Sequence, residues 1–167
     1  GTFHVDESND RLKVSTLDGT DFAAGKTVRV DATVWAWTSP ASDRLDLYYA
    51  ADAASPAWTF IGTLTPTLAG SQVLSATYTL PAGAQQAVRA RFRYNGSAVA
   101  CATSGYEDHD DLVFAAEPPF VDGGKGAVAI PSTIWSSGKC SSCALCRATS
   151  RQRAAICTVP ARVDVGA

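Results

Sequence analysis

The sequence has no methionine, only two histidines, and no apolar run long enough to cross a bilayer. Since position 1 is glycine, we expect that a preceding segment, such as a secretion signal, has been removed. A helix would place apolar residues every three or four positions, and no such pattern occurs before residue 145. These absences predict a β protein without a membrane span.

Motifs for catalysis are missing as well. No serine lies between the glycines of a nucleophile elbow, and paired carboxylates for glycoside hydrolysis can be nominated only within residues 107–111. His109 lies among carboxylates, which we expect to raise its pKa and keep the ring protonated. We therefore predict that the chain is not an enzyme.

What the sequence does contain is alternation of apolar and polar residues, which is typical of half-buried strands. In the clearest case, Lys26–Trp37, five small apolar residues fall on one face and Trp35 and Trp37 on the other. The expected strands are Phe3–Val5, Leu12–Val14, Lys26–Trp37, Arg44–Tyr49, Trp58–Leu64, Gln72–Leu80, Val88–Tyr94 and Leu112–Phe114. Turn residues separate them, so we predict an all-β, antiparallel β-sandwich of jelly-roll or immunoglobulin-like type.

Charge divides the chain into two parts, a β-sandwich domain (residues 1–116) and a C-terminal extension (residues 117–167). The domain carries 8 Lys and Arg against 13 Asp and Glu (net −5), and the extension 6 against 3 (net +3). Opposite charges attract within a chain or between chains, although both can equally be solvated surfaces. The acidic domain disfavours nucleic-acid binding. We expect an ordered extension that donates edge strands, such as Ala127–Ile130, and packs on the domain or on another chain.

Clustered carboxylates favour a calcium site, because Ca²⁺ takes six to eight oxygen ligands. The candidate ligands are Asp108, Asp110 and Asp111, joined by Asp6 and Glu7 if the first and last strands are neighbours, with Asp10 and Glu107 as further candidates. The spacing differs from that of an EF-hand loop. The alternative is a solvated acidic loop in which an aspartate caps a turn.

Cysteine is sparse in the domain and dense in the extension: Cys101 stands apart from Cys140, Cys143, Cys146 and Cys157. The spacing fits neither a zinc ribbon nor a complete ferredoxin motif. We predict disulfides and an oxidising, extracellular compartment. Four cysteines allow three pairings, and Cys101 is buried, pairs with the extension, or links to a neighbouring chain.

Three further groups of residues are candidates for binding or modification. Arg89, Arg91 and Arg93 share one strand face, where they bind an acidic glycan or phosphate or, as we expect, form a cross-strand ladder with Asp31 and Asp46. The aromatic residues Trp35, Trp37, Tyr48 and Trp58 form a sugar-stacking platform or belong to the core. Asn95-Gly96-Ser97 is a glycosylation sequon on an expected hairpin turn.

Several blocks of the domain, in order, resemble a known module. They are residues 26–37, Leu45–Asp52, Leu74–Gly83, Val88–Tyr94 and Asp108–Phe114. Residues 3–116 thereby resemble the non-catalytic β-sandwich, jelly-roll-like, that is attached to secreted bacterial hydrolases, notably thermolysin-like metallopeptidases. The resemblance implies an extracellular, non-catalytic role and does not extend to residues 117–167.

Two functions follow as hypotheses. The first is an extracellular structural or adhesive subunit that self-associates, with the extension adding a strand to a neighbour's sheet and producing filaments. The second is an accessory module of a secreted hydrolase that binds carbohydrate or protein. The long extension and the opposite charges favour the first, and the resemblance favours the second.

Overall fold

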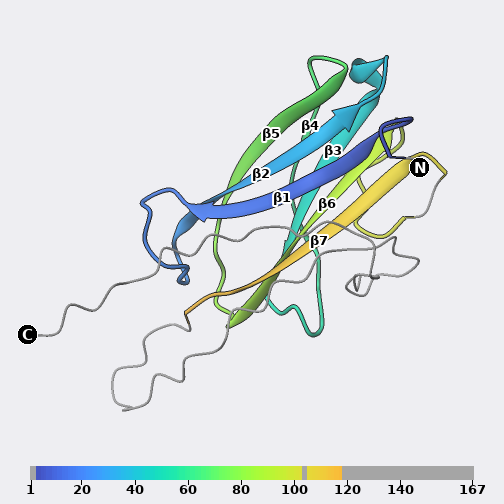
Figure 1. Ribbon diagram of the computed structural model, residues 1–167. Helices are drawn as coiled ribbons and strands as arrows, with labels where there is room; N and C mark the ends of the chain where they lie inside the picture. Colours follow the sequence, from blue (N-terminus) through green and yellow to red (C-terminus); the bar gives the residue numbers. More distant parts are fainter. Residues whose placement is uncertain (1–2, 103–104, 118–167) are drawn as a thin grey trace, which may run out of the picture.

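The computed structural model describes residues 3–102 and 105–117, and over these ranges the regular secondary structure is almost entirely β-strand (Figure 1). A single turn of 3₁₀ helix, Pro40–Ser42, is the only helix in the described part, so no helix there is long and apolar enough to cross a membrane. The strands are β1 (Ser8–Thr16), β2 (Thr27–Ala36), β3 (Asp43–Ala50), β4 (Thr59–Leu64), β5 (Gly70–Thr79), β6 (Gln85–Tyr94) and β7 (Glu107–Ala115).

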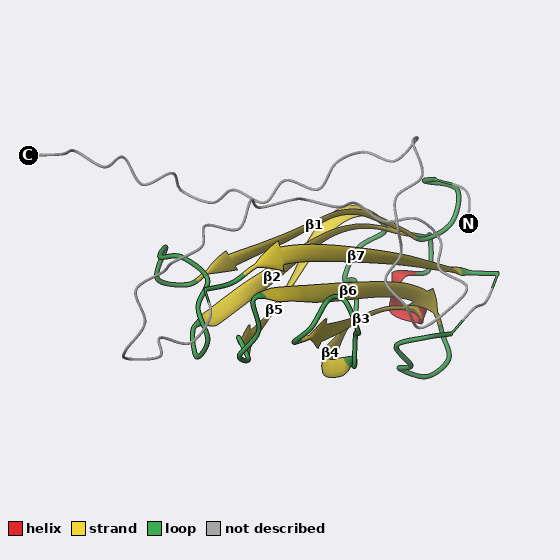
Figure 2. Cartoon of the chain, turned by 90° about the horizontal axis from the view of Figure 1, so that it is seen from below, coloured by secondary structure: helices red, strands yellow, loops and turns green. Residues whose placement is uncertain are grey.

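The strands form two antiparallel sheets, which confirms the predicted β-sandwich. One sheet has the order β1-β2-β5 and the other β4-β3-β6-β7. Seven strands in sheets of three and four match the immunoglobulin-like alternative, whereas a jelly roll has eight strands. Seen from below, β1 and β7 close one side of the sandwich, and β4 and β5 lie at the other side (Figure 2).

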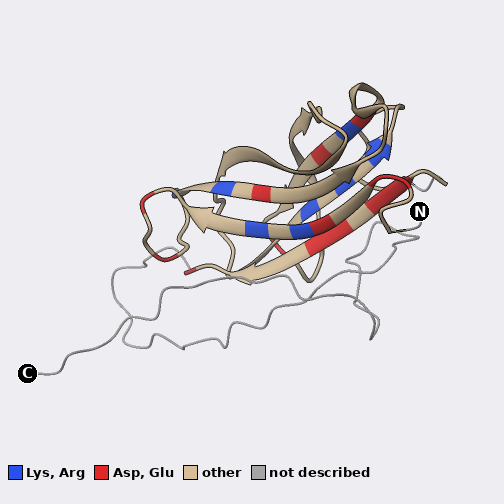
Figure 3. Cartoon of the chain, turned by 45° about the horizontal axis from the view of Figure 1, so that its top comes forward, with Lys and Arg blue, Asp and Glu red and all other residues tan. Residues whose placement is uncertain are grey.

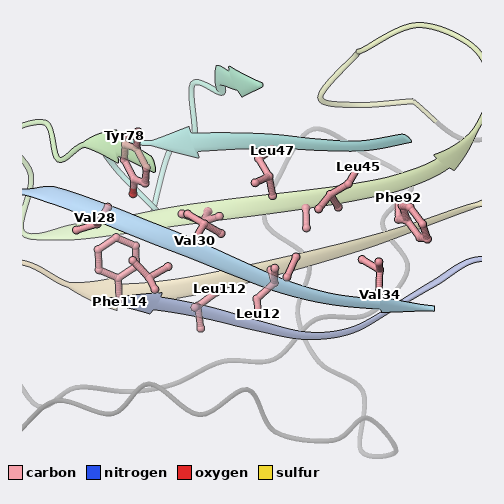
Figure 4. Packing of buried hydrophobic residues seen from close by; sticks show 14 of the residues in the cluster. Leu12, Val28, Val30, Val34, Leu45, Leu47, Tyr78, Phe92, Leu112 and Phe114 are labelled. Carbon is pink, nitrogen blue, oxygen red and sulfur yellow. The ribbon is translucent and has the colours of Figure 1, made fainter. Parts of the chain in front are cut away.

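The core lies between the two sheets, where alternate residues of each strand point inward (Figure 4). In β2 the five inward positions predicted from the sequence, from Val28 to Ala36, are all buried, because period-two alternation places them on one face. Leu45 and Leu47 of β3 and Phe92 of β6 meet them from the other sheet. The apolar pattern thus predicted β2 and the face that it buries, whereas the expected strand Phe3–Val5 is a turn.

The two acidic segments, residues 6–10 and 107–111, lie between the expected strands but belong partly to observed ones. β1 begins at Ser8 and is one continuous strand. β7 begins at Glu107, so that Glu107–Asp111 runs along β6. The reason is pairing: Asp111 lies opposite Arg89 and Glu107 opposite Arg93, so the charges of one strand match those of its neighbour.

The Asn95-Gly96 turn also differs from the prediction. Both residues have positive φ (52° and 74°), as such a turn requires, but residues 95–106 form a long connection from β6 to β7 rather than a two-residue hairpin. The extension beyond residue 117, with its expected strands, lies outside the described residues.

The turn between β5 and β6 packs closely on the connection after β3, and Gly83 lies at the point of contact. A Cβ at Gly83 would lie 2.1 Å from the carbonyl oxygen of Ala51. We predict that Gly83→Ala lowers the free energy of unfolding by about 1–3 kcal/mol, because backbone must move to relieve the overlap. Gly62→Ala is the control, since a Cβ there meets nothing within 4 Å. Urea denaturation measures both, and equal midpoints would contradict the prediction.

Candidate functional site

The outward face of β6 carries a row of buried arginines. Their guanidinium groups form ion pairs with carboxylates of the two neighbouring strands: Arg89 with Asp111 (2.8 Å), Arg91 with Glu107 (Nε to Oε2, 2.8 Å) and Arg93 with Asp46 (2.6 Å). The side chains of all six are at most 6% exposed. Three positive and three negative charges therefore balance each other on this face.

The connection between β6 and β7 folds back over the same row. Arg89 donates to the carbonyl of Ala100 (2.9 Å), Arg91 to that of Ser97 (2.9 Å) and Arg93 to that of Gly96 (2.8 Å). The Trp58 ring lies over the Arg89 guanidinium at 4.3 Å, a cation–π contact. With carboxylates, carbonyls and a ring around them, these arginines are structural groups, not an open anion site.

The predicted cross-strand ladder of arginines and carboxylates is thus present, with one of its two predicted acidic partners. Asp46 pairs with Arg93 as expected, but Asp31 does not, because β2 belongs to the other sheet. Asp31 instead lies beside Arg29 and accepts a hydrogen bond from Ser75 (2.7 Å).

His109 lies within this charged face, opposite Arg91, and the expectation for its pKa was wrong. Burial lowers the pKa of His109, because taking the ring out of water disfavours its charged form. The charges of Glu107 and Asp111 act in the opposite direction, but those of Arg89 and Arg91 work against them. The sequence showed the neighbouring carboxylates and not the arginines opposite them.

A second group of buried charges gathers where β1 and β3 begin. Burial raises the pKa of Glu7, and the nearby charges of Asp6 and Asp43 raise it further. Burial also raises the pKa of Asp43, although its Oδ2 accepts a hydrogen bond from the Trp37 N–H (3.0 Å). One oxygen of each of these three carboxylates is buried without a hydrogen-bond partner in the described part of the chain.

The five predicted calcium ligands are not brought together. Asp111 faces outward to Arg89, whereas Asp108 accepts a hydrogen bond from the backbone N–H of Asn9 (2.9 Å) on the other side of β7. The first and last strands are neighbours, as the hypothesis required, but Glu7 lies near Asp43, which was not a candidate. Residues 3–102 and 105–117 contain no group of three or more His, Cys, Asp or Glu arranged to hold a metal ion. Calcium binding stays a prediction.

The four aromatic residues do not form one platform. Trp35 lies on the three-stranded sheet and stacks on His4 (4.1 Å between centroids), which stacks on Phe3 (3.7 Å). Tyr48 is buried in β3 of the other sheet, and Trp58, just before β4, lies over Arg89. The predicted sugar-stacking surface is therefore divided between the two outer faces.

Of the predicted modification sites, Asn95 is exposed on its turn, a position that is accessible to glycosylation. Cys101 is partly buried in the connection between β6 and β7, where its Sγ lies 3.6 Å from Nη1 of Arg89. Cys140, Cys143, Cys146 and Cys157 lie outside the described residues, so the pairing stays a prediction.

One side of the sandwich has no charge, a feature that the sequence analysis missed. No charged residue or histidine occurs between Asp52 and Arg89, a segment that contains all of β4 and β5. In Figure 3 both strands are tan along their length, whereas the other five carry blue or red segments that mark charged residues. The signal was available in the sequence as an uncharged run, but only the fold shows that it occupies one side of the molecule.

The same side is also the least covered part of the core. Leu74 and Ala76 of β5 and Ile61 and Leu64 of β4 are only partly buried. Three exposed apolar side chains lie around them: Phe60, Leu68 and Val73, at 50%, 68% and 58% exposure. β5, at the edge of its sheet, pairs only with β2 among the described strands. This uncharged side, which we call the β4/β5 side (residues 53–88), is the candidate interaction surface.

No family model matches the chain, and a search of curated proteins finds no match.

Removing one member of the arginine row tests whether it stabilises the sheet. We predict that Arg89→Gln lowers the free energy of unfolding by about 3–5 kcal/mol, since Asp111 would remain buried without its counter-charge. The same substitution at Arg29, whose side chain is 48% exposed, should cost less than about 1 kcal/mol. Chemical denaturation compares them, and a small loss at Arg89 would show that the face is hydrated.

The buried carboxyl of Glu7 predicts a pH dependence. Its pKa is raised in the folded state, so its stabilising contribution is full below the unfolded pKa of about 4.3 and is lost as the pH rises above it. The glutamine of Glu7→Gln needs no proton to be neutral. The melting temperature of this variant relative to wild type should therefore increase from pH 4 to pH 7. Glu117→Gln makes the same substitution at an exposed position and is the matched control.

Calcium is tested on the same variants, because a bound cation would reverse this trend. If Glu7 ligates calcium, the wild-type melting temperature rises with Ca²⁺ and falls with chelator, and Glu7→Gln removes the response. An equal melting temperature of the wild type in Ca²⁺ and in chelator would exclude the predicted site.

Proposed function

We propose that this chain is an extracellular, non-catalytic structural subunit that self-associates. The observation that carries the proposal is the β4/β5 side. Folded proteins usually protect an edge strand with charges, a proline, a bulge or a covering loop, because unpaired N–H and C=O groups invite pairing with another chain. β5 is a ten-residue edge strand with neither a charged residue nor a proline.

The opposite side of the sandwich provides the contrast. The β1 edge has a register shift between Asn9 and Arg11 and carries Asp10, Arg11 and Lys13. It is also fastened to the other sheet, since the Asn9 side chain donates to the carbonyls of Ala90 (3.3 Å) and Asp108 (3.0 Å). One side of the same molecule is thus closed and charged and the other open and neutral, as expected of a subunit that buries one side in an assembly.

Residues 117–167 are part of the proposal as the second assembling element. Their net charge of +3 complements the −5 of the domain, and a contact between domain and extension of different copies is head-to-tail, which gives open filaments unless its geometry closes. The five cysteines, four of them in the extension, support an oxidising, extracellular location in which they form disulfides. The accessory-module hypothesis remains the competing proposal.

The full, unreduced chain tests the proposal through its mass in solution and negative-stain microscopy. We expect the full chain to form an oligomer or a filament. A chain that ends at Glu117 should form nothing larger than a dimer. Truncation also removes four cysteines, so the full chain with Cys101→Ser is the control for loss of the disulfide that we predict at Cys101. Circular dichroism must first show that the truncated chain keeps its strands. A monomeric full chain at all concentrations would overturn the proposal and favour the accessory module.

A further inference from the structure

The direction of the hydrogen bonds along β5 shows which of its residues are available at the free edge. Leu80, just after β5, donates its N–H to the carbonyl of Lys26 (2.8 Å), in register with Thr27 opposite Thr79. In an antiparallel ladder alternate residues bond the same neighbour. The even-numbered residues of β5 therefore bond β2, and the odd-numbered ones direct N–H and C=O to the free edge: Ser71, Val73, Ser75, Thr77 and Thr79.

These five residues are complementary to themselves. When a second β5 is placed antiparallel with Ser75 opposite Ser75, Val73 lies opposite Thr77 and Ser71 opposite Thr79. Every pair is then of the hydrogen-bonded type, so the two strands exchange about ten hydrogen bonds. Serine, threonine and valine on one face include the β-branched residues that pack well across strands.

Charge does not oppose this pairing. In a two-fold interface each residue meets its own kind or a near neighbour, so a charged strand would bring like charges together. β5 and its flanking loops have none, and Asp31 on β2, the nearest carboxylate on that face, already has Arg29 and Ser75 as partners. Pairing would also cover the partly buried Leu74 and Ala76 and bring exposed Phe60 towards the partner.

We propose that β5 of one chain pairs antiparallel with β5 of a second copy across a two-fold axis at Ser75, joining two three-stranded sheets into one of six strands. This inference rests on the proposed self-association, but not on the extension. The other edges fit a second copy less well: β4 has six residues and an irregular register, and β7 carries Asp108 and Asp110. The longest uncharged segment of the extension, residues 126–138, contains Pro131, which lacks an N–H, whereas β5 contains no proline.

A charge within the pairing tests the interface. Val73→Lys places a lysine opposite Thr77 of the partner in each half of the interface, where pairing would remove charge from water. It should weaken dimer formation about tenfold, measured by sedimentation equilibrium of the full chain. The side chain of Val73 is 58% exposed, so the fold itself should be unaffected. Val99→Lys is the matched control, because it makes the same change at an exposed valine of the β6–β7 connection.

Cross-linking tests the register. In the proposed pairing the two Ser75 Cα atoms lie about 5.5 Å apart, within disulfide range, and the two Thr77 Cα atoms lie roughly 14 Å apart. Mild oxidation of the full chain with Ser75→Cys should therefore give a covalent dimer on a non-reducing gel. Thr77→Cys should give no more dimer than the wild type, which controls for the native cysteines.

The outcomes separate this inference from the proposed function. The β5 interface is supported if Val73→Lys weakens the dimer, Val99→Lys does not, and Ser75→Cys gives a covalent dimer. A full chain that assembles normally with Val73→Lys and does not cross-link through Ser75→Cys overturns the inference and leaves self-association standing. Equal cross-linking at Thr77→Cys overturns the register. A monomeric wild type overturns both proposals.

Discussion

The burial of β6 on both faces is the constraint on which the rest of the structure depends. Its inward residues, among them Val88 and Phe92, fill the core, while its outward arginines are covered as well. A buried guanidinium is tolerated only when it is paired and its donors are satisfied. This requirement explains why β7 brings carboxylates to β6, why β3 places Asp46 beside it, and why the carbonyls of residues 96–100 lie over the row.

The sequence revealed the strands because alternation is a local property. The five inward residues of β2 and the strands from β3 to β6 were predicted within a few residues, since an apolar face needs only its own periodicity to be recognised. β7 was predicted too short because its first five residues are polar on both faces. Their place in the sheet depends on the arginines of β6, a long-range pairing that periodicity does not show.

The site was harder to predict for the same reason. Grouping Asp108, Asp110 and Asp111 as calcium ligands assumed a turn, whereas a strand directs Asp111 to one face and the other two to the opposite face. His109 was assigned the wrong direction of pKa shift because its burial and the facing arginines come from the fold. The uncharged run from residue 53 to 88 had a meaning only once β4 and β5 were seen to share one side.

The buried arginine row and the uncharged β4/β5 side both follow from how charge is distributed over the domain. All thirteen acidic residues of the domain precede residue 53 or follow residue 106. Every basic residue of the domain precedes residue 53 as well, except the three arginines of β6, which pair with buried carboxylates. Outside β6, the charges of the domain therefore lie on β1, β2, β3 and β7 and on the connections before residue 53, and none lies on β4 or β5. An isologous contact through β5 closes after two copies, so a filament needs a second, head-to-tail contact, and the charged surfaces and the extension are what remain to provide it. A neutral two-fold interface combined with an electrostatic one would make the dimer insensitive to salt and the filament sensitive to it.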